Sequence, residues 1–80
     1  MKMEDSVINI ITSVLQIPRS EVTVETEIGE PDEWDSLHNV TIFSEIQKEF
    51  GITITPDMLI DLENVADIIK MVEELTDGNG

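Results

Sequence analysis

Apolar residues at helical spacing in three segments constrain the fold of this 80-residue chain more than any other feature. The first segment covers residues 3–15, the second covers residues 36–50, and the third begins near residue 64. Residues three or four positions apart lie on one face of a helix, so each segment predicts an amphipathic helix. Such helices bury their apolar faces against one another, which predicts a small all-α bundle.

Residues at the ends of these segments support the predicted helix boundaries. Asp35 is a favoured N-cap for the second helix, and Gly51 suits the left-handed position just past its end. Thr55 followed by Pro56 predicts a short additional helix over residues 56–60. The second helix is expected to bury an apolar stripe formed by Leu37, Val40, Phe43, Ile46 and Phe50.

In the connection after the first helix, residues 16–35, apolar residues do not recur with any sustained period. A loop of about twenty residues is long for a compact domain and is usually functional. We expect its scattered apolar residues to hold it against the core, and short strands at 21–24 and 52–54 are the alternative. The chain is expected to form a single domain over residues 1–80, with a frayed tail at 76–80.

Charge and composition narrow the classes of function. The chain has 18 acidic and four basic residues, a formal net charge of −14, and it has no cysteine. Such a charge repels nucleic acid and anionic membranes and favours partners with basic surfaces. The acid clusters lack the ligand order of a calcium loop, so no metal site is expected. With no targeting segment recognised, we expect a cytoplasmic protein, and we expect it to be a monomer.

Ser36 is the strongest candidate for chemistry, because it follows Asp35 at the start of the second helix. Unpaired backbone N–H groups and the helix macrodipole favour a phosphate at this position. His38 is two positions away and does not face the serine on a helix, so no general base is available. Ser36 is therefore expected to be modified by another enzyme, and the chain is not expected to be an enzyme itself.

The run Asp35-Ser36-Leu37 at the head of the second helix resembles the attachment signature of acyl carrier proteins and related carrier domains. The helix plan, the long first loop, residues 50–54 and the pair Asn64-Val65 also resemble that family over nearly the whole chain.

The resemblance implies that Ser36 is esterified by 4′-phosphopantetheine, which a phosphopantetheinyl transferase takes from coenzyme A. The thiol of this arm would carry acyl groups as thioesters, which agrees with a chain that has no thiol. Asp35 would assist the Mg²⁺-dependent transfer. Leu37 and Val40 would lie where the arm and the transferase make contact. The implied fold is an acyl-carrier-like bundle. The implied function is that of a stand-alone carrier protein.

The sequence departs from the pattern of the fatty-acid carriers just after the serine. That pattern usually has acids in the first turns of the second helix, whereas this chain has His38, Asn39 and Thr41 there. This favours a dedicated pathway, such as polyketide, nonribosomal peptide or specialised fatty acid synthesis. The partners would be acyl-transferring, condensing or ligase enzymes with basic docking surfaces. They are expected to contact His38, Val40, Thr41, Glu45, Asp57 and Asp61. Two alternatives stay open: an aminoacyl or peptidyl carrier, and an unmodified acidic helical adaptor.

Overall fold

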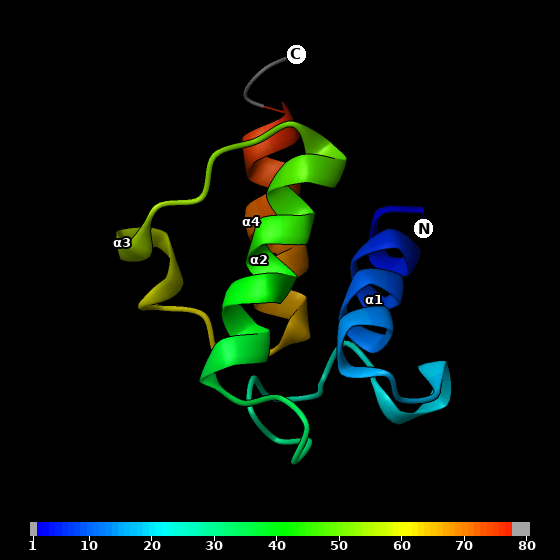
Figure 1. Cartoon of the computed structure of the whole chain (residues 1–80). Coiled ribbons are helices and arrows are strands. Elements are labelled where there is room, and N and C mark those ends of the chain that lie inside the picture. The colour runs from blue at the N-terminus through cyan, green and yellow to red at the C-terminus, as the bar shows by residue number, and fades with distance from the viewer. Residues whose placement is uncertain (1, 78–80) are drawn as a thin grey trace.

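The computed structural model describes residues 2–77, which form a small helical bundle (Figure 1). Its elements are α1 (Lys2–Leu15), the 3₁₀ helix η1 (Arg19–Glu21), α2 (Ser36–Phe50), α3 (Pro56–Leu59) and α4 (Val65–Asp77). The prediction of three longer helices and one short helix is confirmed. The alternative with strands is wrong, since the described residues contain only an isolated bridge between Glu27 and Asn64. Within residues 2–77, no helix combines the length and apolar character needed to cross a bilayer.

The core lies where α1, α2 and α4 meet. Helix α1 packs against both other long helices, and α3 stands on the opposite side of α2 (Figure 1). The largest side chains that are fully buried come from these three helices: Ile11, Ile42, Ile46, Ile68, Val7, Val65 and Val72. The first loop adds buried Val22 and Trp34 to the same cluster, so the expectation that its apolar residues hold it against the core is confirmed.

The buried face of α2 differs from the predicted stripe. Ile42, Phe43 and Ile46 are buried, whereas Leu37 and Val40 are 74% and 67% exposed. The reason is the helical phase of about 100° per residue, which places position 39, and not 37 or 40, in line with the buried face. That position is occupied by Asn39. Phe50, at the end of the helix, is half-buried.

The helix ends follow the predicted chemistry in most places. Gly51 has the left-handed φ of 64° past the end of α2, as its position predicts. Thr55 precedes Pro56 at the start of α3, but its side chain makes no cap hydrogen bond. Thr76 and Asp77, expected in a frayed tail, belong to α4. Residues 78–80 of that tail lie outside the described residues.

The start of α4 anchors the first loop. The backbone N–H groups of Val65 and Ala66 donate to the Thr26 and Val24 carbonyls, at 2.9 and 2.8 Å. The next N–H, of Asp67, donates to the Asn64 side chain at 2.9 Å. Helix N-termini leave these N–H groups without helical partners, so the loop supplies the missing acceptors. This pairing fixes the loop that leads to the start of α2.

Candidate functional site

Ser36 is the first residue of α2 and is exposed to solvent. Asp35 precedes it in extended backbone conformation, and its Oδ1 atom accepts a hydrogen bond from the His38 backbone N–H at 2.9 Å. The predicted N-cap is therefore present. Among the described residues, the Ser36 hydroxyl has no hydrogen-bond partner, so its Oγ is open to an incoming group.

The His38 ring makes a second bond to the same carboxylate oxygen. Its Nδ1 lies 2.8 Å from Asp35 Oδ1, and because an ionised carboxylate only accepts, Nδ1 is the donor. The backbone N–H of His38, and then its ring, lower the pKa of the Asp35 carboxyl below the ordinary value of 3.8. Both bonds end on Oδ1, which leaves Oδ2 without a partner among residues 2–77.

Sequence reasoning missed this pairing. Asp35 and His38 are three positions apart, a spacing at which side chains on a helix can meet, and that was the available signal. On the sequence alone, His38 is interpreted as a partner contact and rejected as a base for Ser36, and it is not related to Asp35. In the structure His38 holds Asp35 and makes no hydrogen bond to Ser36.

Trp34 ties the end of the loop to α2. The indole is buried, and its Nε1–H donates to Asn39 Oδ1 at 2.8 Å. A hollow of about 260 Å³ lies beside the serine and is lined by Ile28, Trp34, Asp35, Ser36 and Asn39. The Trp34 bond fixes the position of Asp35 and Ser36 relative to the core. Neither Trp34 nor Asn39 was predicted as a site residue.

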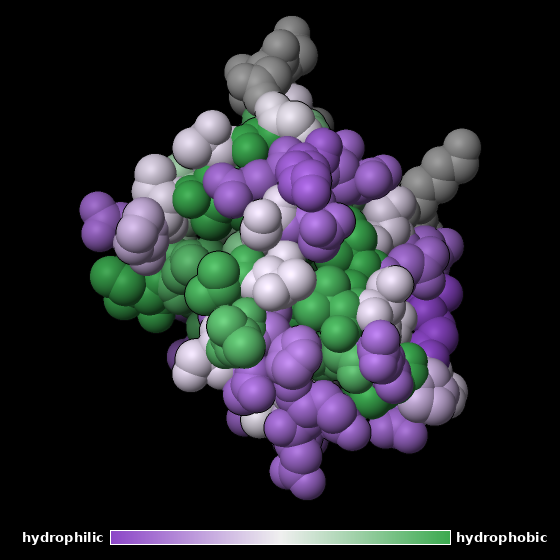
Figure 2. All heavy atoms as spheres, in the orientation of Figure 1, coloured by the Kyte–Doolittle hydropathy of each residue, from purple (hydrophilic) through white to green (hydrophobic). Residues whose placement is uncertain are grey.

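Apolar and neutral side chains follow the serine on the outer face of α2. Leu37 and Val40 are exposed there, and the Thr41 hydroxyl donates to the Leu37 carbonyl at 3.2 Å. Ile60, just past α3, is 76% exposed. Figure 2 shows apolar side chains gathered on the α3 side of the molecule and extending onto the neighbouring part of α2. The first turn of α2 contains no acid.

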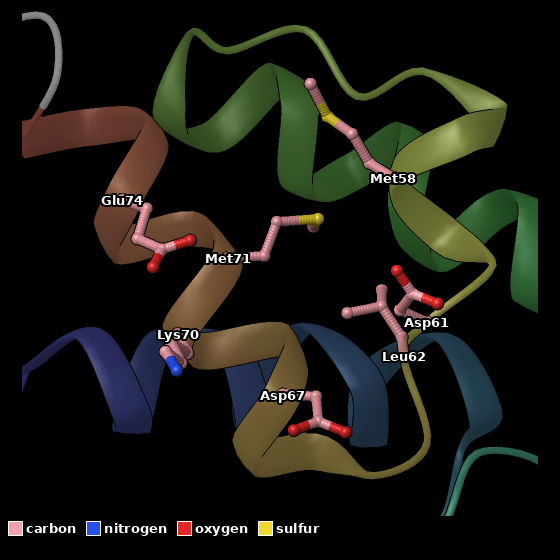
Figure 3. Close-up of a pocket in the computed structure, with 7 residues that line it drawn as sticks. All are labelled: Met58, Asp61, Leu62, Asp67, Lys70, Met71 and Glu74. Carbon is pink, nitrogen blue, oxygen red and sulfur yellow. The ribbon is translucent and has the colours of Figure 1, made fainter.

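The predicted acidic contacts lie farther along the molecule. Glu45 is exposed on α2, with an ion pair of 3.5 Å to Lys48, and Asp57 is exposed in α3. Asp61 lines a separate groove between α3 and α4, together with Met58, Leu62, Asp67, Lys70, Met71 and Glu74 (Figure 3). None of the residues around Ser36 lines that groove. The structure therefore brings together Asp35, Ser36, Leu37 and His38, and leaves Asp61 apart from them.

A family model and curated relatives match most of this chain. A family model described as "Phosphopantetheine attachment site" matches residues 5–72. The acyl carrier protein of Thermobifida fusca (strain YX) is 34% identical over 70 residues, which cover 88% of this chain and 89% of the relative. That of Rickettsia massiliae (strain Mtu5) is 32% identical over 73 residues, which cover 91% of this chain and 85% of the relative.

A solved structure shares the fold. The solution NMR structure of the holo acyl carrier protein from Geobacter metallireducens matches with a TM-score of 0.86 at 24% sequence identity. The match covers 99% of this chain and 91% of that one. The family model and the curated relatives confirm the family that the sequence resembles. Its members are carriers and not catalysts: they hold a covalent phosphopantetheine arm and interact with phosphopantetheinyl transferases and acyl-handling enzymes. This chain, with its helical bundle and its match to the attachment-site model, belongs to the acyl carrier protein family.

Proposed function

We propose that Ser36 is the residue that carries the 4′-phosphopantetheine arm, and that acyl groups are held on the arm as thioesters. The observation that supports this is the exposed Ser36 hydroxyl at the first residue of α2, without a hydrogen-bond partner in the described chain. The N–H groups and the positive end of the helix dipole favour the phosphodiester that the modification creates. Since the chain has no cysteine, the thioester sulfur has to come from the arm.

Asp35 is proposed to assist the Mg²⁺-dependent transfer from coenzyme A. Two bonds from His38 hold its carboxylate through Oδ1, and Oδ2 has no partner among the described residues. An ionised carboxylate oxygen is a ligand that Mg²⁺ prefers. Its pKa is lowered from the ordinary 3.8, so the carboxylate is ionised at neutral pH with or without this shift. Leu37 and Val40, both exposed next to the serine, are proposed to contact the transferase.

We also propose that the carrier serves a dedicated biosynthetic pathway. The α2 surface that follows Ser36 offers no acid to basic partner surfaces, because the first turn of α2 has no acid and Thr41 stands in the next turn. Partners would then recognise the exposed apolar side chains and Thr41 beside the serine. Glu45, Asp57 and Asp61 would add charged contacts at a greater distance from the arm.

The attachment is tested by intact-mass measurement after incubation with coenzyme A and a transferase of broad specificity. The expected product carries one phosphopantetheine group on the parent and none on Ser36→Ala. Ser44→Ala is the matched control, because Ser44 is also an exposed serine of α2, and it should gain the group as the parent does. Modification of Ser36→Ala, or a parent that several transferases leave unmodified, would contradict the proposal.

A further inference from the structure

The His38 side chain and its backbone N–H both bind one oxygen of the Asp35 carboxylate. Asp35 is the N-cap of α2 and His38 lies three positions on, a spacing at which side chains at a helix start can meet. The backbone N–H and ring Nδ1 lie 2.9 and 2.8 Å from Asp35 Oδ1. A carboxylate oxygen has two lone pairs, so Oδ1 is fully occupied and Oδ2 keeps both of its own.

The ring bond restricts the rotation of the carboxylate. The backbone N–H alone is enough to cap the helix, as it is wherever an aspartate is the N-cap. The terminal torsion of an aspartate is broad and two-fold, so with that bond alone the two oxygens can exchange places. With two bonds on one oxygen, every exchange has to break both. The ring therefore keeps Oδ1 of Asp35 on the helix and leaves Oδ2 available to a ligand.

A histidine can hold the carboxylate without adding a permanent positive charge. A neutral imidazole donates through Nδ1 and leaves the negative charge on Asp35, whereas a lysine or arginine would place a fixed cation there. Among the side chains that the structure describes, arginine and lysine pair with Asp5 and Glu45, and none of them pairs with Asp35. Asp35 is also exposed and borders the same hollow as Ser36, so both are open to one incoming group.

We propose that His38 is a positioning residue for the phosphopantetheinyl transfer, because it holds Asp35 with Oδ2 available to the Mg²⁺ of that reaction. The inference rests on the proposed attachment at Ser36 and adds the residue that orients Asp35. In the transfer, Ser36 Oγ loses its proton to solvent and bonds to the phosphorus that carries pantetheine. The bond from that phosphorus to the departing adenosine 3′,5′-bisphosphate breaks. Mg²⁺ would offset the charge on the phosphate oxygens, and carboxylates that bind metals are commonly held by outer hydrogen bonds of this kind.

The test compares variants of position 38 with a transferase of broad specificity, coenzyme A and limiting Mg²⁺, with intact mass as the measure of rate. His38→Asn places an amide N–H₂ donor at the branch position of Nδ1, whereas His38→Leu has nearly the shape of asparagine and no donor. We expect His38→Leu to be modified about 10-fold more slowly, as loss of an outer hydrogen bond to a metal ligand usually costs at least that much. His38→Asn should restore most of the parent rate.

Three comparisons separate positioning from a structural role or a surface contact. The loss in His38→Leu should fall on kcat, because a lost contact with the transferase surface would raise KM for the carrier. Added Mg²⁺ should narrow the gap to the parent, which it would not do for a damaged fold. Asp35→Asn keeps an N-cap but loses the charge, and in that background His38→Leu should cost nothing further.

Nitrogen NMR of the ring tests the bond without the transferase. Above the pH range in which histidine titrates, the proton should be on Nδ1 in the parent. A proton on Nε2 would overturn the inference. Equal rates for His38→Leu and the parent, a loss confined to KM, or a cost of His38→Leu that persists in Asp35→Asn would do the same. A parent that gains no mass is a different outcome: it would overturn the proposed attachment at Ser36 and the inference with it.

Discussion

Two hydrogen bonds from His38 end on one oxygen of Asp35, and they have a consequence that depends on pH. Hydrogen bonds to the ionised carboxylate favour the charged form, so the pKa of Asp35 in the folded protein lies below its ordinary value of 3.8. The ionised group therefore stabilises the fold at pH values above 3.8. That contribution is lost as the pH falls through the folded-state pKa, where both states become protonated.

His38→Ala separates the ring from the backbone at this position. The variant keeps the backbone N–H, which is the larger cause of the shift, and loses the ring bond. We expect the pKa of Asp35 to rise and to stay below 3.8, as measured by NMR titration of the side-chain carboxyl carbon. The part of the difference in unfolding midpoint that varies with pH should disappear below the folded-state pKa, which leaves only the constant effect of alanine on helix propensity. An unchanged Asp35 pKa would show that the ring forms no lasting bond in solution.

On the scale of the helix, burial in α2 follows the side that packs against α1 more closely than residue type. Phe43 is 5% exposed inside the core, while Phe50 is half-buried at the end of the helix. The apolar pattern alone placed both in one stripe with Leu37 and Val40. The structure separates residues that pack inside from apolar residues that remain on the surface beside Ser36.

Truncation of the two phenylalanines measures this difference. Phe43→Ala should lower the free energy of unfolding by about 3–5 kcal/mol, the usual cost of removing a buried phenylalanine. That is a large share of the stability of a small domain. Phe50→Ala should cost clearly less, because the ring is already partly in solvent. Urea denaturation of both variants provides the comparison, and equal losses would mean that Phe50 is as deeply packed as Phe43.

Local signals account for the parts of the fold that the sequence predicts well. Asp35, Gly51 and Pro56 act on their own neighbours, and for that reason the bounds of α2 and the start of α3 could be read from the chain. The backbone hydrogen bonds from α4 to residues 24 and 26 join segments about forty residues apart, and no local sequence pattern predicts them. The Trp34–Asn39 bond depends on the way the loop returns to α2, so the polar residue on the buried face of α2 could be recognised only in the structure.

Across the whole molecule, the net charge of −14 is distributed unevenly with respect to the candidate site. The ion pairs Arg19–Asp5 and Lys48–Glu45 are exposed, and surface pairs of this kind add little stability. The exposed acids Asp32, Glu33 and Asp35 lie in the loop just before Ser36, whereas the first two turns of α2 after it contain no acid. A basic partner is therefore attracted by the molecule as a whole and by the end of this loop, and it finds no acid on the α2 surface that follows the serine.

This distribution predicts which enzymes use the carrier. His38→Asp with Thr41→Glu places two acids beside the arm, and fatty-acid synthesis enzymes with basic docking surfaces should then associate several-fold faster at low salt. Because the gain is electrostatic, it should shrink as the ionic strength approaches about 0.15 M. His38→Asn with Thr41→Gln is the matched control: it also removes the ring from Asp35 but adds no charge, and it should give no gain. The measurement is the rate at which a ketosynthase or a malonyl transferase uses each loaded carrier over a series of salt concentrations.

Two outcomes would contradict this prediction. Equal rates for the parent and the acidic variant would show that partner choice is determined elsewhere on the surface. A gain in both variants would assign the effect to loss of the His38–Asp35 pair and not to charge.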